Sequence, residues 1–270
     1  MTLLPSHKYF IFNGEIKPVS EFIDCENDGG IYEVIRVIKG IPLFINDHLL
    51  RFYKSAKIAE ISVSYSSYEL ESFLKLLIQK NGINEGNLLV SFKSNLKILY
   101  IPHKYPTDKN YSEGVNCGAL FAERENPNAK VFQTQVRQKA NKLISDNGFY
   151  EVLLIDNSGR ITEGSRSNIF FVSKNQIITP PGTGVLLGIT RQKIIQLTKY
   201  LGFNFVEKEV PFDELSTFDA LFISGTSPKI LPVKQVGKIK FNPQNKILQT
   251  LIKQYNMLVN DYLKTKSLTK

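Results

Sequence analysis

The spacing of apolar residues in the first third of the chain predicts a mixture of strands and helices. Residues 31–45 form two apolar runs joined at Lys39-Gly40, which predicts a pair of strands. An apolar stripe of helical spacing then predicts a helix that ends at Ile58, with Asp47 as its N-cap. The residues of that stripe are Leu49, Phe52, Tyr53 and Ala56.

A capping-box pair, Ser66 with Glu69, predicts the start of a second helix. The apolar face of this helix comprises Leu70, Phe73, Leu74, Leu77 and Ile78. Short apolar runs then predict strands at 88–92 and 98–101.

The second half of the chain begins with a predicted helix over 131–146, which Asn147-Gly148 ends. Residues 151–162 follow as a hairpin whose turn contains glycine. The remaining predicted elements are strands at 168–172, 203–210 and 220–224, a helix from Thr190 as its cap to Leu201, and a final helix over 246–263.

Between the two halves lies a polar segment, 102–114, that is rich in turn-forming residues. Helices and strands are interleaved on both sides of it without strict β-α-β alternation. We therefore expect a two-domain α/β (α+β) protein, divided into residues 1–112 and 113–270.

The composition is that of an ordinary globular protein. Of 270 residues, 42% are hydrophobic and 22% charged. The sequence contains no apolar run of the ~18–20 residues that span a bilayer. The first residues lack the features of a signal peptide, so we expect a cytoplasmic protein without membrane contact.

The chain carries a formal net charge of +9, from 34 Lys and Arg against 25 Asp and Glu. A basic nucleic-acid-binding protein is therefore one reading of the sequence, although the basic residues form no block or known module. Anionic small molecules fit this charge equally well. With only Cys25, Cys117 and three His, neither a disulfide framework nor a metal site is expected.

Two segments carry candidate chemistry. The residues Gly188, Ile189 and Thr190 open a predicted helix, where free backbone N–H groups and a hydroxyl favour an anion such as phosphate. The segment 224–228 (SGTSP) follows an apolar strand, and its glycine permits close approach of a ligand to the backbone. Each feature alone is also typical of an ordinary helix cap or turn.

Taken together, these segments resemble the class IV pyridoxal-phosphate enzymes, which include branched-chain and D-amino-acid aminotransferases and aminodeoxychorismate lyases. The family signature has three parts, separated by short gaps, and the sequence meets each of them. The matching residues are Glu163, Ser165, Asn168, Ile169 and Phe170, then Ile177 and Thr179, then Leu186, Gly188, Ile189 and Arg191.

The resemblance implies a fold-type IV enzyme, with a smaller N-terminal α/β domain, a larger C-terminal mixed β/α domain and pyridoxal 5'-phosphate bound between them. It further implies a homodimer. Lys130, 33 residues before Glu163 and at the start of the predicted helix, is the expected Schiff-base lysine. Glu163 is expected at the pyridine nitrogen. The other expected cofactor-binding residues are Arg51, Ser165, Gly188, Ile189, Thr190 and Thr226.

Substrate residues are less sharply indicated. The residues that we expect around the substrate are Tyr32, Arg36, Lys93, Arg166 and Ser227. Arg36 is included because it shares a strand face with Tyr32 and Val34. Arg36, Lys93 and Arg166 are the alternative partners for a substrate carboxylate. Tyr32, Val34 and Phe92 are expected to form an apolar wall.

The resemblance favours transfer of an amino group between an α-amino acid, branched-chain-like, and a 2-oxo acid. The main alternative is an aminodeoxychorismate lyase, which yields 4-aminobenzoate and pyruvate. Lys93-Ser94 stands where the lyases often have Arg-Gly, and the Arg-x-His carboxylate trap of D-amino-acid enzymes is absent. Gln135 also replaces a Tyr of the branched-chain members.

Overall fold

The computed structural model describes residues 4–23, 30–132 and 134–268, and its internal contacts divide the chain into two units. The first unit comprises Met1–Lys104, Ala129–Thr134 and Val259–Lys270, and the second comprises Tyr105–Asn128 and Gln135–Leu258. The first boundary falls after Lys104, whereas the expected one lies at residue 112, and two later segments, one of which carries Lys130, group with the first unit.

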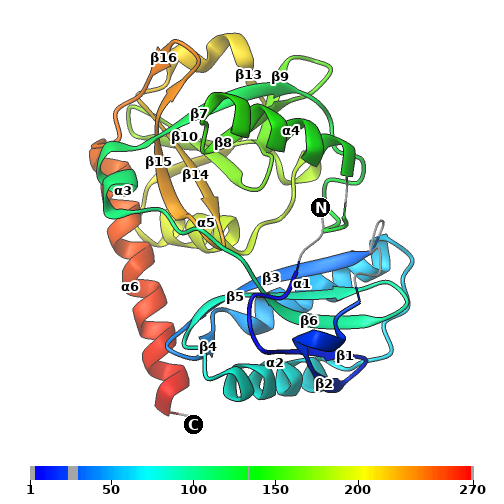
Figure 1. Cartoon of the computed structure of the whole chain (residues 1–270). Helices are drawn as coiled ribbons and strands as arrows, with labels where there is room; N and C mark the ends of the chain where they lie inside the picture. Colours follow the sequence, from blue (N-terminus) through cyan, green and yellow to red (C-terminus); the bar gives the residue numbers. More distant parts are fainter. Residues whose placement is uncertain (1–3, 24–29, 133, 269–270) are drawn as a thin grey trace. The chain divides into compact units, whose positions relative to one another are not determined.

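The first unit is built on a six-stranded antiparallel sheet (Figure 1). Its strands are β1 (Tyr9–Phe12), β2 (Glu15–Pro18), β3 (Ile31–Ile38), β4 (Ile41–Pro42), β5 (Glu85–Phe92) and β6 (Leu96–Ile101), in the order β2-β1-β6-β5-β3-β4. Helices α1 (Ile45–Ile58) and α2 (Ser67–Asn81) bury their apolar faces against one side of it. A one-turn 3-10 helix, Val19–Glu21, follows β2.

Burial alternates strictly along β3, as period-two geometry requires. Ile31, Ile35 and Val37 are fully buried on the side of the helices, whereas Tyr32, Val34 and Arg36 are half-buried on the other side. The expectation that Tyr32, Val34 and Arg36 share a face is therefore confirmed.

The sequence predicts the N-cap of α2 correctly and that of α1 wrongly. The Ser66–Glu69 capping box is present, with Glu69 N–H donating to Ser66 Oγ at 3.2 Å. Asp47, in contrast, does not cap α1. The carbonyl of Phe44 already accepts from His48 N–H, so Phe44 is the N-cap and Asp47 lies inside the first turn.

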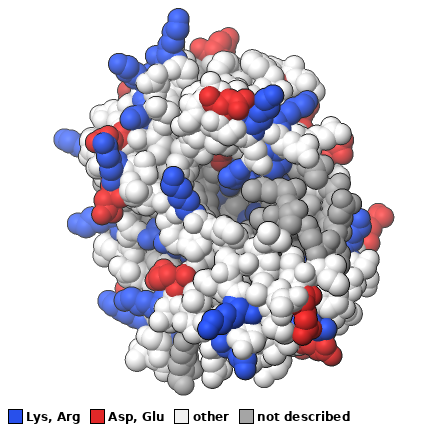
Figure 2. All heavy atoms as spheres, in the orientation of Figure 1, with Lys and Arg blue, Asp and Glu red and all other residues white. Residues whose placement is uncertain are grey.

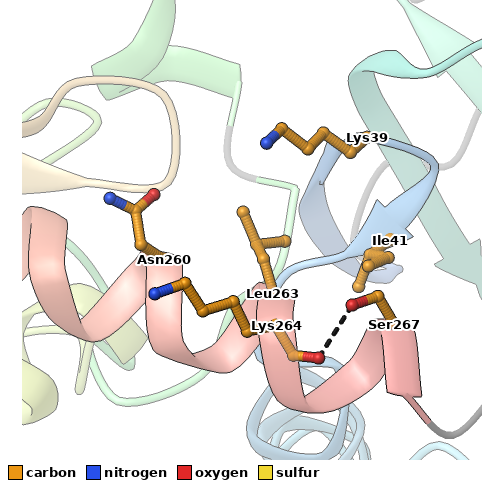
Figure 3. A pocket seen from close by; sticks show the side chains of 6 residues that line it. All are labelled: Lys39, Ile41, Asn260, Leu263, Lys264 and Ser267. Carbon is orange, nitrogen blue, oxygen red and sulfur yellow. Dashed lines mark hydrogen bonds between the residues drawn. The ribbon is translucent and has the colours of Figure 1, made fainter.

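Helix α6 (Lys246–Leu268) runs five residues past the predicted end at 263, and its last part packs in the first unit. Tyr262 accepts a hydrogen bond from Ile45 N–H at 3.3 Å, and its ring meets Phe44 edge-on. A pocket of about 390 Å³ lies between this end of α6 and the β3–β4 turn (Figure 3). Its lining includes Lys39 and Lys264.

The second unit contains a ten-stranded mixed sheet, β12-β11-β10-β14-β15-β7-β8-β9-β13, with β16 paired to β15. The strands are β7 (Val115–Phe121), β8 (Glu151–Ile155), β9 (Arg160–Gly164), β10 (Asn168–Ser173), β11 (Gln176–Thr179), β12 (Asn204–Glu207), β13 (Val210–Pro211), β14 (Ala220–Gly225), β15 (Lys229–Val236) and β16 (Ile239–Lys240). Phe170 and Phe222 stack across β10 and β14 at 4.9 Å.

Helices α3 (Asp108–Glu113), α4 (Thr134–Asn147) and α5 (Ile189–Tyr200) and the 3-10 turns Gly182–Gly184 and Phe212–Thr217 complete the described elements. Helix α3 lies within 102–114, the polar segment rich in turn-forming residues between the two halves. Thr107 and Asn110 form a capping box there that stabilises one short helix. The single strand predicted over 203–210 is two strands, because β12 pairs with β11 and β13 with β9.

On the face drawn in Figure 2, Lys and Arg are dispersed and interspersed with Asp and Glu. No helix of the described residues is long and apolar enough to cross a membrane. Within the same residues, no three His, Cys, Asp or Glu side chains are grouped as metal ligands. Cys117 is a buried free thiol, and Cys25 lies outside the described part of the chain.

Candidate functional site

Lys130 lies in an extended segment beside β3, and α4 begins only at Thr134. The carbonyl of Lys130 accepts from Tyr32 N–H at 3.0 Å, and Phe132 N–H donates to the carbonyl of Gly30 at 2.9 Å. The expectation that Lys130 opens the helix is therefore wrong. The backbone groups here are satisfied by β3 instead of by a first helical turn.

The extended backbone determines where the Lys130 side chain points. Val131 pairs with Ile31, and both pack in the core under the helices. Neighbouring side chains of a strand point to opposite faces, so Lys130 and Phe132 share the face of Tyr32. Accordingly, Lys130 Nζ lies 4.8 Å from the centre of the Tyr32 ring, and Phe132 stacks on that ring at 4.3 Å.

Arg51 belongs to a buried polar cluster on the other face of β3. Its Nε and Nη2 each donate to a different oxygen of Glu33 at 2.7 Å, which makes a bidentate ion pair. His48 Nδ1 lies 2.8 Å from Glu33 Oε2. His48 and Arg51 are one helical turn apart, so α1 presents both to the same carboxylate.

The charges in this cluster are balanced. Burial opposes ionisation of Glu33, but the Arg51 guanidinium and His48 outweigh it and hold the pKa of the carboxyl well below its usual value. Burial lowers the pKa of His48 despite the neighbouring carboxylate, so His48 is neutral at pH 7. The Glu33 anion thus faces the Arg51 cation, and the charge of Lys130 also lowers the pKa of His48.

The other expected residues of the first unit lie apart from this cluster. Arg36 is on the Tyr32 face of β3, opposite Asn87. Lys93 is exposed in the β5–β6 hairpin. Phe92 packs in the core under the helices, so its expected place beside Tyr32 and Val34 is wrong. Its pairing with Ile31 assigns it to the face opposite Tyr32.

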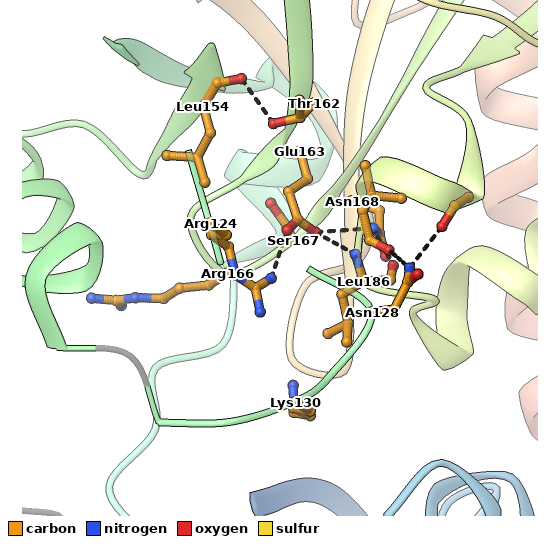
Figure 4. A network of polar contacts seen from close by, with 12 residues as sticks. Arg124, Asn128, Lys130, Leu154, Thr162, Glu163, Arg166, Ser167, Asn168 and Leu186 are labelled. Atoms are coloured by element: carbon orange, nitrogen blue, oxygen red, sulfur yellow. Dashed lines mark hydrogen bonds and ion pairs between the residues drawn. The ribbon is translucent and has the colours of Figure 1, made fainter. Parts of the chain in front are cut away.

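In the second unit, the Glu163 carboxylate is buried and held from two sides (Figure 4). Arg124 Nη1 donates to Oε1 at 2.6 Å, and Leu186 N–H donates to Oε2 at 3.1 Å. Asn168 Nδ2 approaches the same Oε2 at 3.4 Å and donates to the Leu186 carbonyl at 2.8 Å. These contacts fix the orientation of the Glu163 side chain.

The turn after Glu163 is organised by a second buried carboxylate, that of Glu151. Ser165 Oγ donates to it at 2.6 Å, Ser167 Oγ at 2.9 Å and Arg166 N–H at 3.1 Å. The Arg166 side chain is exposed and donates to Asn141 of α4, pointing away from Glu163 in Figure 4. The hydroxyl of Ser165 and the guanidinium of Arg166 are therefore already engaged.

The start of α5 has the form expected of an anion site. The carbonyl of Gly188 accepts from Gln192 N–H, so Gly188 is the N-cap, and this glycine offers no side-chain cap of its own. Thr190, expected as the cap, lies inside the first turn, and both Ile189 and Thr190 are buried. Uncapped N–H groups at a helix N-terminus favour a negatively charged group.

Close packing at this start makes a glycine necessary. A Cβ on Gly188 would lie 2.1 Å from Asn168 Oδ1, whereas one on Gly184 would meet nothing within 4 Å. We therefore expect Gly188→Ala to displace Asn168 and lower the free energy of unfolding by about 1–3 kcal/mol. Gly184→Ala, in the same loop, should change it by less than about 1 kcal/mol. Urea unfolding of both variants tests this, and equal midpoints would contradict it.

Thr226 and Ser227 are half-buried in the turn between β14 and β15. The pairing of Gly225 with Lys229 closes this turn. Ser224, the last buried residue of β14 before it, has a hydroxyl with no hydrogen-bond partner among the described residues. The SGTSP segment thus has the local structure that its sequence predicts, a turn directly after a buried strand.

Several polar residues of the site were not predicted from sequence. They are Glu33, His48, Ser55, Arg124, Asn128 and Glu151. A signal was available for two of them, because His48 and Ser55 lie with Arg51 at helical spacing on the otherwise apolar face of α1. For Arg124 and Glu151 there was none, because their partners are set by strand pairing far along the chain.

Comparison with known proteins shows which protein family the chain matches. The family model described as Amino-transferase class IV matches residues 30–236. The chain is 31% identical to a D-alanine aminotransferase of Bacillus licheniformis, over 94% of this chain and 99% of the relative. It is 27% identical to a probable branched-chain-amino-acid aminotransferase of Rickettsia bellii, over 93% and 96%.

A solved structure is similar over nearly the whole fold. It is the branched-chain amino acid aminotransferase of Escherichia coli, at a TM-score of 0.85 and 23% identity. The alignment covers 94% of this chain and 95% of that one. At this identity, the likeness shows that the fold is shared.

Proposed function

Because the chain belongs to the class IV aminotransferase family, we propose that it is a pyridoxal-phosphate enzyme that moves an amino group from an amino acid to a 2-oxo acid. The observation that carries the proposal is in the second unit. The side chain of Asn168 contacts both the buried, fixed carboxylate of Glu163 and the start of α5 at Gly188.

The residues present fit the cofactor. Three N–H groups at the start of α5 and the hydroxyl of Thr190 suit its phosphate, with Thr226 as a further donor. Glu163 suits the pyridine nitrogen, because an ionised carboxylate holds that nitrogen protonated. When bound, the cofactor supplies an electron-accepting ring. Arg51 belongs to the proposal as a further phosphate ligand, and its Nε and Nη2 also hold Glu33.

Lys130 is the proposed nucleophile and proton carrier. Its amine lies over the Tyr32 ring, on the sheet face that also carries Val34 and Phe132. A neutral amine there accepts the proton from the substrate α-carbon and returns it at the next step. The ring of Tyr32 restricts the directions from which water reaches that amine.

The proposed donor is a branched-chain amino acid. The face of β3 beside Lys130 is lined by apolar side chains, Tyr32 and Val34 packed with Leu89 and Leu99. An aliphatic substrate needs such a wall and one cationic partner for its carboxylate, which we assign to Arg36 on the same face. D-Alanine is the second candidate donor, favoured by the 31% identical relative.

A single-turnover assay tests the function. The protein, loaded with cofactor and without an acceptor, is mixed in turn with L-leucine, D-alanine and aminodeoxychorismate. We expect L-leucine to convert the visible absorbance of the bound cofactor once, with one equivalent of 2-oxo acid. Conversion by D-alanine alone would contradict a branched-chain donor and assign D-alanine as the amino donor. Continuous pyruvate release from aminodeoxychorismate would replace the transaminase by a lyase.

A further inference from the structure

Ser55 places a hydroxyl against the backbone of Lys130. Its Oγ accepts from Lys130 N–H at 3.1 Å, and the side chain is 1% exposed. Ser55 lies one turn after Arg51 on the buried face of α1. The two residues have different partners, since Arg51 bonds the Glu33 carboxylate and Ser55 bonds a peptide group.

The segment that carries Lys130 also has a short backbone pairing with β3. Its pairing is an isolated bridge, Ile31 with Val131, with one backbone hydrogen bond on each side. A continuing antiparallel ladder would direct Lys130 N–H back to the carbonyl of Tyr32. Here that N–H bonds Ser55 instead, so the chain leaves β3 at Lys130. Ser55 therefore supplies a hydrogen bond to this stretch in addition to the two that its backbone makes with β3.

The orientation of the Lys130 peptide determines where its amine lies. The side chain leaves the backbone on the Tyr32 face, and Nζ is at its far end, above the Tyr32 ring. Loss of the Ser55 bond releases the Lys130 N–H, while the Lys130 carbonyl, in the next peptide unit, stays bonded to Tyr32 N–H, so rotation about the Lys130 Cα–C bond is less restrained. Such a rotation displaces Nζ more than any backbone atom.

We propose that Ser55 is a positioning residue for the amine of Lys130, acting through the Lys130 peptide N–H. The inference deepens the proposed function and rests on it for the role of Lys130. Ser55 touches neither substrate nor cofactor in this assignment. Its contribution is geometric, and misplacement of a reacting group by about 1 Å costs up to roughly 10²-fold in rate.

Two variants separate the hydrogen bond from the packing. Ser55→Ala removes the acceptor and leaves a small cavity, whereas Ser55→Cys fills the space with a weak acceptor. The amount of active enzyme is measured as the cofactor that borohydride captures covalently, and kcat is divided by this amount. For both variants we expect this normalised kcat to fall about tenfold, with KM changed by less than about twofold. The pH midpoint of the absorbance of the bound cofactor should also shift, because it reports the environment of the Lys130 nitrogen.

A readout without cofactor completes the test. In the cofactor-free protein, hydrogen exchange at the Lys130 amide should be faster in both variants, because that N–H loses its acceptor. Ser72→Ala is the matched control, since Ser72 is a half-buried helical serine whose hydroxyl donates to the carbonyl of Tyr68 in its own helix. This control should leave exchange, kcat and the pH midpoint unchanged.

The outcomes distinguish a wrong role for Ser55 from a wrong proposed function. Wild-type kcat per captured cofactor, an unchanged pH midpoint and unchanged exchange in the Ser55 variants would overturn the inference alone. If wild-type protein captures no cofactor at Lys130 at all, the proposed function fails and the inference fails with it.

Discussion

Lys130→Ala is expected to lower the rate of amino transfer by at least about 10³-fold and to abolish covalent capture of the cofactor by borohydride. The physical reason is that the same amine bonds the cofactor and carries the substrate proton. The fold should remain, because the hydrogen bonds of Lys130 with Tyr32 and Ser55 are made by its backbone. Steady-state turnover and mass spectrometry after borohydride treatment measure both effects.

Lys139→Ala is the matched control for this experiment. Lys139 is an exposed lysine of α4, nine positions further along the chain. Its replacement should leave capture and turnover within about twofold of wild type, as surface substitutions usually do. If Lys139→Ala removed the captured cofactor while Lys130→Ala retained it, the assignment of the nucleophile would be wrong.

Glu33→Gln is expected to lower the free energy of unfolding at pH 7 by about 3 kcal/mol or more. The substitution keeps the volume of the side chain but leaves the buried Arg51 cation without a counter-charge, and breaking a buried ion pair from one side typically costs about 3–5 kcal/mol. Glu71→Gln removes a partly exposed pair with Lys75 and should cost less than about 1 kcal/mol. Urea unfolding of the cofactor-free proteins compares the two.

The same pair gives a pH dependence with a definite sign. The folded protein holds the pKa of Glu33 below the 4.5 of an unperturbed carboxyl. Its stabilisation is therefore complete above about pH 4.5 and is lost as the pH falls below that value. The loss is about 1.4 kcal/mol per pH unit, so the gap between wild type and Glu33→Gln should narrow by about 2 kcal/mol between pH 4.5 and pH 3. A constant gap over this range would contradict the assignment.

Local elements were predictable where the signal is itself local. The Ser66–Glu69 box, the alternation of β3 and the strand before SGTSP depend on neighbouring residues, and the structure confirms them. The family resemblance is confirmed as well. It could be predicted because the family signature lies within one stretch of chain.

The errors occur where distant contacts decide. Val131 has helical spacing with later residues, yet pairing with Ile31, about a hundred positions away, makes its backbone extended. The partner of Arg51 was missed for the same reason, because Glu33 lies within an apolar strand and gives no sign of which helix it faces. Homodimer formation and a cytoplasmic location stay predictions, as do the roles of Lys93, Arg166 and Ser227.

The discontinuity of the first unit has a consequence for the order in which the protein is made. The six-stranded sheet and its helices come from residues 9–101, but the strand segment with Lys130 and the Tyr262 contact, 217 positions from Ile45, are synthesised later. Loop closure over such separations adds only about 0.6 kcal/mol per doubling of length, so the delay is kinetic and not a loss of stability. Ile31, which pairs with Phe92 of β5 on one side, gains its second partner only after the segment with Lys130 has been synthesised, and the proposed nucleophile is among the last parts of its own unit to be added.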